Sequence, residues 1–205
     1  MLAFLFFLCT TLRLDCLNWA ETYPYRPDVS VEVRADNDSL YLHWLVTETS
    51  VRGTVTRDQG PMWEDSCVEF FCLLPDGKHY TNFEWNCLGY CLSDIQENKY
   101  DSNRVHRSPE QLASMPRRAS LGRDSIGMME GETHWELQTA VPLHWLLDDS
   151  CWNSRGQLKR GTTIRCNFYK CADRSATPHF VTWKPIRSPK PDFHCPQDFV
   201  LLRLR

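Results

Sequence analysis

Apolar and polar residues alternate along much of this chain, and a repeat of two residues is the pattern of β-strands. Val29–Val33 and Leu40–Val46 alternate on either side of a turn at Asp36–Ser39, which predicts a hairpin. Further strands are predicted over residues 51–56, 67–74, 79–86, 89–93, 117–121, 133–141, 162–170, 180–183 and 199–204. Because these strands are short and separated by turns, the predicted fold class is all-β, an antiparallel β-sandwich of the jelly-roll kind.

Helical spacing is rare in the sequence. Pro109–Ala113 predicts a short helix, with Ser108 as its N-cap and a proline at the first helical position. Residues 142–147 predict a second short helix or a turn. We therefore expect a sandwich with one or two short helices. The 205 residues contain no internal repeat and no linker long enough to separate domains, so residues 14–205 are expected to form a single domain.

Residues 1–13 form an apolar N-terminal segment whose status the sequence leaves open. Met1–Cys9 resembles the core of a signal peptide, but no lysine or arginine precedes it and no small-x-small cleavage site follows it. The run is too short to cross a bilayer, so no integral membrane span is expected. A docking helix, a signal and an incorrect start are the alternatives.

A row of polar residues falls on one face of the strand predicted over residues 79–86. Asn82, Glu84 and Asn86 share this face because every second side chain points the same way, and aromatic residues alternate with them on the other face. Amide and carboxylate groups together offer donors and acceptors for a hydroxyl-rich ligand. Trp63 follows a Gly-Pro turn and offers a flat apolar surface for the C–H groups of a sugar. This combination predicts carbohydrate binding, and an ordinary solvent-facing strand is the alternative.

Charge and composition limit the partners. The formal net charge is −3, from 23 basic and 26 acidic residues, so no basic surplus favours nucleic acid. No run of like charge marks an interaction tail, and no protein partner can be inferred. Eight tryptophans are many for this length, which is consistent with an aromatic-lined site beside the core.

Ten cysteines raise the alternatives of disulfides and a zinc site. No C-x-x-C pair occurs, whereas zinc sites commonly have closely spaced pairs separated by a fixed gap. The cysteines are therefore interpreted as small buried hydrophobic side chains with free thiols, and no metal ligands are assigned among them. Free thiols favour a reducing compartment such as the cytoplasm, whereas a functional N-terminal signal would mean secretion.

Several segments together resemble a known family. They are WEDSCVEFF at 63–71, YTNFEWNCLG at 80–89, RCNFYKCAD at 165–173, and PHFVTWKPI at 178–186 with PKPDFHCPQDF at 189–199. LNWAETYPYRP at 17–27 fits as well. These motifs resemble the family 9-like carbohydrate-binding modules, in particular a subgroup of stand-alone bacterial proteins, from about Leu14 to the C-terminus. The resemblance implies a β-sandwich that binds sugars, often with structural calcium.

The resemblance also implies site residues. Such modules place tryptophans around the sugar, which makes Trp63 and Trp183 the expected pair of aromatic walls for a mono- or oligosaccharide chain end. Glu69 becomes an expected acceptor for sugar hydroxyls. Asn167 and Lys170 are further candidates, but they lie on opposite faces of the strand at 162–170 and would reach one site only through a bulge.

Two other interpretations stay open at this point. Glycosidases use two carboxyl groups about 5–10 Å apart, and Glu69, Glu84 and Glu136 could supply such a pair from neighbouring strands. A scaffold that keeps the fold without its sugar site is a further alternative. For calcium, Asp36–Asp38 and Asp148–Asp149 are the only dense groups of oxygen ligands, and each is also typical of a plain turn.

Overall fold

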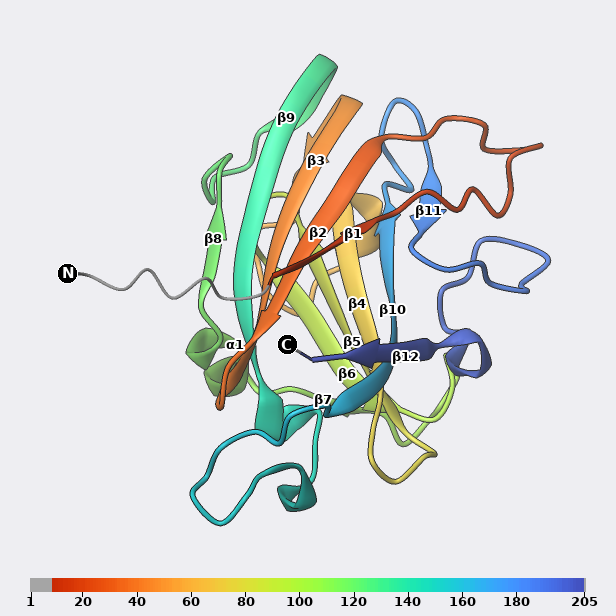
Figure 1. Cartoon of the computed structure of the whole chain (residues 1–205). Helices are drawn as coiled ribbons and strands as arrows, with labels where there is room; N and C mark the ends of the chain where they lie inside the picture. Colours follow the sequence, from red (N-terminus) through yellow and green to blue (C-terminus); the bar gives the residue numbers. More distant parts are fainter. Residues whose placement is uncertain (1–8, 205) are drawn as a thin grey trace.

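The computed structural model describes residues 9–204, which fold into two antiparallel sheets packed face to face. In Figure 1 the first sheet, with β2, β3 and β9, lies across the second sheet, with β4, β5 and β10. The predicted β-sandwich is confirmed. The part of Met1–Cys9 that precedes Cys9 lies outside the described residues.

The first sheet has five strands in the order β1-β2-β3-β9-β8. Their bounds are Thr10–Arg13 for β1, Asp28–Ala35 for β2, Ser39–Gly53 for β3, Gly127–Pro142 for β9 and Arg117–Ala119 for β8. β2 and β3 form the predicted hairpin. β3 continues past its predicted end as a single long strand, so residues 51–53 belong to it and no separate strand begins at Val51. Its register against β9 shifts between Glu48 and Ser50, which marks a bulge.

The second sheet has seven strands, in the order β11-β10-β4-β5-β6-β7 with β12 also paired to β10. Their bounds are Cys67–Leu73 for β4, Tyr80–Asn86 for β5, Cys91–Gln96 for β6, Val105–His106 for β7, Thr163–Cys171 for β10, Phe180–Thr182 for β11 and Val200–Arg203 for β12. β4 and β5 form the second predicted hairpin. The short β7 was not predicted, because two exposed residues cannot show an alternating pattern.

Helical structure is confined to short segments. The one α-helix of the described chain, α1, spans Pro109–Ser114. Its N-cap is Ser108, as predicted, and Gln111 completes a capping box. The 3-10 helices are η1 at Met62–Glu64, η2 at Leu143–Trp145, η3 at Asp149–Cys151 and η4 at Pro196–Asp198. Within residues 9–204, none of these helices is long and apolar enough to cross a membrane.

Both faces of the second sheet are buried, and this explains why β4 reads as a nearly continuous apolar run. Val68, Phe70 and Cys72 point into the main core between the two sheets. Cys67 and Phe71 point the other way, into a second apolar cluster on the outer face of the sheet. The segment between β11 and β12 covers that outer face at one end, through side chains such as Phe193 and Phe199. The second cluster therefore borders any site built on this face.

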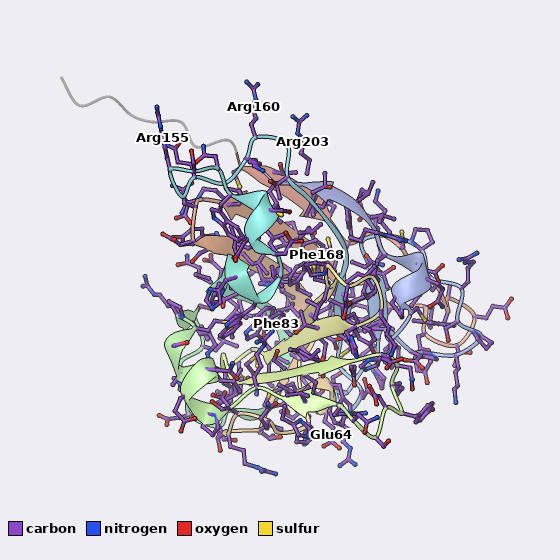
Figure 2. The ribbon with its side chains drawn as sticks, turned by 90° about the horizontal axis from the view of Figure 1, so that it is seen from below. Glu64, Phe83, Arg155, Arg160, Phe168 and Arg203 are labelled. Carbon is purple, nitrogen blue, oxygen red and sulfur yellow. The ribbon has the colours of Figure 1, made fainter. Side chains whose placement is uncertain are left out.

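The side chains fill the interior between these layers (Figure 2). Phe83 and Phe168 lie in the packed centre and are fully buried. Arg155, Arg160 and Arg203 project outward at one end of the molecule. Thr10–Arg13, at the end of the apolar N-terminal segment, pairs with β2 as an edge strand of the first sheet.

Candidate functional site

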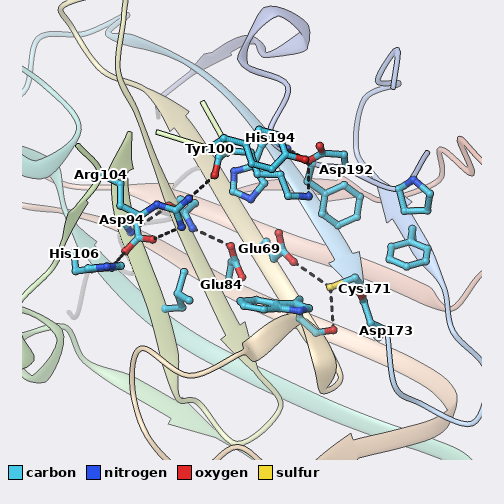
Figure 3. A pocket seen from close by; sticks show the side chains of 17 residues that line it. Glu69, Glu84, Asp94, Tyr100, Arg104, His106, Cys171, Asp173, Asp192 and His194 are labelled. Carbon is cyan, nitrogen blue, oxygen red and sulfur yellow. Dashed lines mark hydrogen bonds and ion pairs between the residues drawn. The ribbon is translucent and has the colours of Figure 1, made fainter. Parts of the chain in front are cut away.

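A cavity of about 410 Å³ opens on the outer face of the seven-stranded sheet (Figure 3). This volume lies within the range of about 300–1,000 Å³ typical of small-ligand sites. Its floor comes from β4, β5 and β6. Its walls come from Trp63, Asp173, residues 99–106 and residues 191–194.

The floor is polar because of strand alternation. Asn82 and Glu84 point outward from β5, while Phe83 and Trp85, which alternate with them, point into the main core. Glu69 of β4 lies directly opposite Glu84, and Asp94 of β6 lies directly opposite Asn82. All four side chains are buried. The sheet therefore holds one carboxyl–carboxyl pair and one amide–carboxyl pair in a fixed arrangement at the bottom of the cavity.

Glu69 and Glu84 are hard to ionise. Burial, together with the neighbouring Glu84, raises the pKa of Glu69 well above its ordinary value. Burial and the nearby Asp94 raise the pKa of Glu84 to about 7, although Asn82 Nδ2 donates a hydrogen bond to Glu84 Oε1 at 2.8 Å. Near neutral pH, part of this floor is protonated. It can then donate as well as accept hydrogen bonds, as a sugar hydroxyl does.

Within the described chain, the basic side chains beside the floor pair with other acidic groups and form no ion pair with Glu69 or Glu84. Asp94 contacts His106 Nδ1 at 2.6 Å and Arg104 Nη1 at 3.6 Å. Lys99 Nζ lies 3.3 Å from Asp192. These basic groups are therefore already paired, whereas no ion pair joins Glu69 or Glu84 to a basic side chain within residues 9–204. Figure 3 shows the paired groups beside Glu84 and Glu69.

Trp63 supplies an aromatic surface at the mouth of the cavity. It lies on η1, directly before β4, and 40% of the residue is exposed. The backbone N–H of Asp173 donates to its carbonyl oxygen at 3.0 Å, which ties η1 to the chain after β10. Tyr100 is a second exposed aromatic at this cavity, on the loop between β6 and β7. Exposed aromatics next to buried polar groups are typical of a ligand site.

Comparison with known families decides the family. The sequence profile of carbohydrate-binding family 9 matches residues 8–204.

The chain belongs to carbohydrate-binding family 9.

Solved structures agree with this family 9 assignment. A Bacteroides uniformis protein to which carbohydrate binding is ascribed is 37% identical, with a TM-score of 0.84 over 96% of this chain and 86% of that one. Family 9 modules from Caldicellulosiruptor kristjanssonii share the fold at 10% identity. The module in complex with glucose has a TM-score of 0.54 over 88% of this chain and 78% of its own, and the module with cellotriose has 0.56 over 88% and 76%. No curated protein matches the sequence.

The family 9 cavity brings together only part of the predicted site. Trp63, Glu69, Asn82 and Glu84 line it. Asn86, Asn167, Lys170 and Trp183 do not, and each is held elsewhere by contacts that the sequence pattern does not show.

Asn86 shares the face of Asn82 and Glu84 but lies at the end of β5, under the chain around η1. Its side-chain nitrogen donates to Val55 O at 2.8 Å and to Asp65 Oδ2 at 2.9 Å, and its oxygen accepts from the backbone N–H of Tyr90. All of its hydrogen-bonding capacity on this side is used within the protein. Asn86 therefore fastens the loop that carries Trp63 and lies outside the lining of the cavity.

Replacement of Asn86 by alanine should lower the free energy of unfolding by about 1–3 kcal/mol, because buried partners lose their hydrogen bonds. Affinity for a ligand of the cavity should stay close to that of the unmodified protein. Chemical denaturation and calorimetric titration measure the two quantities on the same sample. Normal stability combined with weakened binding in Asn86→Ala would indicate that Asn86 contacts the ligand directly.

Asn167 and Lys170 point to opposite faces of β10, because this strand has no bulge at these positions. Asn167 binds the backbone of Lys184 through both ends of its amide, at 3.1 Å each, and so fixes the chain after β11. Lys170 lies between the two sheets, where its Nζ contacts Glu48 Oε2 at 2.9 Å. Neither side chain reaches the cavity.

Trp183 does not form a second aromatic wall. Its ring packs edge-on against Phe168 of the main core, with 5.7 Å between ring centroids. Lys184 Nζ lies over the same ring, 4.7 Å from its centroid. Trp183 therefore packs against the main core and does not face the cavity.

Several residues of the cavity were not predicted. They are Asp94, Lys99, Tyr100, Arg104, His106, Asp173, Asp192 and His194. Most lie in irregular chain, where no periodicity shows which way a side chain points. Asp94 and His106 lie on strands, and only Asp94 lies on a strand long enough to alternate: β6 places it on the same face as its neighbour Asn82.

Each acidic turn considered for calcium uses a carboxylate to cap its own backbone. Asp36 accepts hydrogen bonds from two backbone N–H groups of its own turn and from the Tyr41 hydroxyl. Asp148 accepts from Ser150 N as the cap of η3. Calcium needs six to eight oxygen ligands. In the described chain, neither turn brings three acidic, cysteine or histidine ligand atoms within 4.8 Å of one another.

Proposed function

We propose that the cavity on the outer face of the second sheet binds a mono- or oligosaccharide, at a chain end, without chemical turnover. Trp63 stacks against the C–H face of one sugar ring. Glu69, Asn82 and Glu84 exchange hydrogen bonds with its hydroxyl groups, and Arg104, paired with Asp94 of the floor, bounds the site at one wall.

One observation carries this proposal: an exposed tryptophan stands next to a buried floor of amide and carboxyl groups that can both donate and accept. An apolar ligand would leave the remaining donor and acceptor positions of that floor without partners, at a cost of about 1–3 kcal/mol for each group left unsatisfied. A sugar offers apolar C–H surface to the ring and hydroxyls to the floor. Membership of family 9 and the fold shared with modules in complex with glucose and cellotriose support the same ligand class.

Hydrolysis is the second candidate, because Glu69 and Glu84 are two carboxyls with raised pKa in one cavity. Glycosidases place such a pair on either side of the scissile bond. Here the two residues are direct cross-strand neighbours, and both project from the floor in the same direction. Glu136 cannot complete a pair, since it lies on β9 of the other sheet and contacts His43 at 2.9 Å. The geometry therefore favours binding.

A glycan array followed by calorimetric titration of Trp63→Ala tests the proposal. Removal of the ring should weaken binding of the best array ligand by about 1–3 kcal/mol, judged from the apolar surface that a sugar would cover. Thermal stability should change little, because Trp63 is partly exposed in the free protein.

Trp152→Ala is the matched control, because this partly exposed tryptophan lies outside the cavity. Normal affinity in Trp63→Ala would show that the Trp63 ring does not contact the sugar. Silence across the array would favour a scaffold without a sugar site. Cleavage of the bound oligosaccharide, followed by chromatography, would favour the hydrolase.

A further inference from the structure

Two cysteines and a glutamate gather at the edge of the cavity floor. Cys67 Sγ, Cys171 Sγ and a Glu69 carboxylate oxygen all lie within 4.8 Å of one another. Cys171 Sγ donates to Glu69 Oε1 at 3.0 Å. Within residues 9–204, no other three residues of the cysteine, histidine, aspartate and glutamate types come together in this way.

The sheet itself sets this arrangement. Cys67 of β4 lies directly opposite Cys171 of β10 in the antiparallel register. Glu69 follows two residues later on β4 and so shares their face. All three residues are buried on strands in the middle of the sheet, which fixes their side chains with little freedom. A ligand held there would find its donors already in position.

The donor set fits a borderline divalent metal. Zinc is bound tetrahedrally by thiolate sulfur at about 2.3 Å and carboxylate oxygen at about 2.0–2.2 Å, which places neighbouring donor atoms roughly 3.5–4 Å apart. Cys171 Sγ lies 3.0 Å from Glu69 Oε1, and no two of the three donor atoms are more than 4.8 Å apart, so small side-chain shifts suffice to reach this geometry. Two sulfur donors disfavour calcium and magnesium, which take oxygen ligands.

A bound cation would also stabilise the buried carboxylate of Glu69. This side chain is buried directly opposite a second buried carboxyl, Glu84, and no basic side chain of the described chain forms an ion pair with either. Two adjacent buried carboxyls repel each other when ionised. A divalent ion beside Glu69 would offset that repulsion.

We propose that Cys67, Glu69 and Cys171 form a site for Zn²⁺, with the fourth coordination position open to the cavity. Glu69 and Cys171 both line the cavity, so the ion has a route of entry and water can take the fourth position. The inference does not rest on the proposed sugar function, because it follows from the donor atoms alone.

Metal binding releases protons in a defined balance. Each thiol loses its proton to form a metal–thiolate bond, and Glu69 loses any proton that it holds. Two to three protons therefore pass to the buffer for each Zn²⁺ bound. Affinity should rise with pH accordingly.

The test uses the full chain in a phosphine reductant, with Zn²⁺ alone and Co²⁺ alone as probes. We expect one Zn²⁺ per chain by equilibrium dialysis, and thiolate-to-metal charge-transfer absorption with Co²⁺. Cys171→Ser and Glu69→Gln should each weaken Zn²⁺ binding by about tenfold or more, since loss even of outer-shell partners costs about 10–100-fold.

The chain offers a matched control in Cys72→Ser. Cys72 and Cys166 face each other across the same two strands, but on the inner face and in no three-residue donor group. This variant should keep full Zn²⁺ affinity. Binding below one equivalent, absence of the charge-transfer band, or equal affinity in Glu69→Gln, Cys171→Ser and the unmodified chain would each overturn the proposal.

Discussion

Replacement of Lys170 by methionine should lower the free energy of unfolding by about 3–5 kcal/mol, the cost of leaving a buried charge without its partner. Lys170 and Glu48 are both fully buried between the sheets, with Nζ and Oε2 at 2.9 Å. Lys170 Nζ also donates to Cys171 O, and Trp135 Nε1 donates to Glu48 Oε1. Methionine fills the same space but leaves the carboxylate without its main cation.

The electrostatics of Glu48 support this size of effect. Burial alone would raise its pKa, but Lys170 and the neighbouring His179 lower it to about 2. The carboxylate therefore remains charged in the folded protein over the whole neutral range. With Lys170 absent, Glu48 must stay charged without its main cation, draw a proton onto His179, or take up a proton itself.

Thermal unfolding measures the loss. For a chain of this size each kcal/mol lowers Tm by about 2–4 °C, so we expect a fall of about 6–20 °C. The double variant Glu48→Gln with Lys170→Met removes both charges and should recover part of that loss. A single variant with unchanged Tm, or a double variant less stable than the single, would contradict a dominant role for this ion pair.

The same pair shows where sequence patterns stop being informative. Period-two alternation correctly indicates that Lys170 and Asn167 point to opposite faces of β10. It does not indicate which face meets the other sheet, nor that Glu48 arrives there from β3. The pattern therefore makes Lys170 a candidate for a ligand site, whereas the structure pairs it with the buried carboxylate of Glu48 between the two sheets.

The strands themselves follow from local chemistry. β5 alternates, β4 is a nearly continuous apolar run, and the Pro-Asp-Gly turn between them fixes their register. That register brings Glu69 opposite Glu84, so the floor of the site is encoded in one hairpin. The walls come from irregular segments far away in the sequence, such as residues 191–194, and no local pattern could assign them.

The cysteines show the same limit. Their spacing along the chain gives no sign of a metal site, and all ten are free thiols in the structure. Only the pairing of β4 with β10 reveals that Cys67 and Cys171 are neighbours. Proximity across a sheet is a property of register, which is set by the fold as a whole.

Asp65 connects the stability of the fold to the position of Trp63. It is fully buried and directly follows η1. Its carboxylate accepts hydrogen bonds from Arg52 at 2.5 Å and from Asn86 at 2.9 Å. It also accepts from both the backbone N–H and the hydroxyl of Thr54, and from the backbone N–H of Val55. This one side chain therefore fastens the turn that carries the exposed tryptophan to the end of β3 and to β5.

Replacement of Asp65 by alanine should lower the free energy of unfolding by about 3–5 kcal/mol, because a buried charged acceptor is removed and its donors are left unpaired. It should also weaken binding of a sugar in the cavity, since η1 loses its anchor and Trp63 its fixed position. Denaturation and calorimetric titration measure the two effects, with Asn86→Ala as the control that removes one of the same bonds and leaves the others. Asp65→Asn keeps the shape and one acceptor oxygen, so its losses should be intermediate. If Asp65→Ala loses stability but keeps full affinity for the sugar, the position of Trp63 does not depend on the hydrogen bonds of Asp65. In that case η1 would position the ring without this anchor.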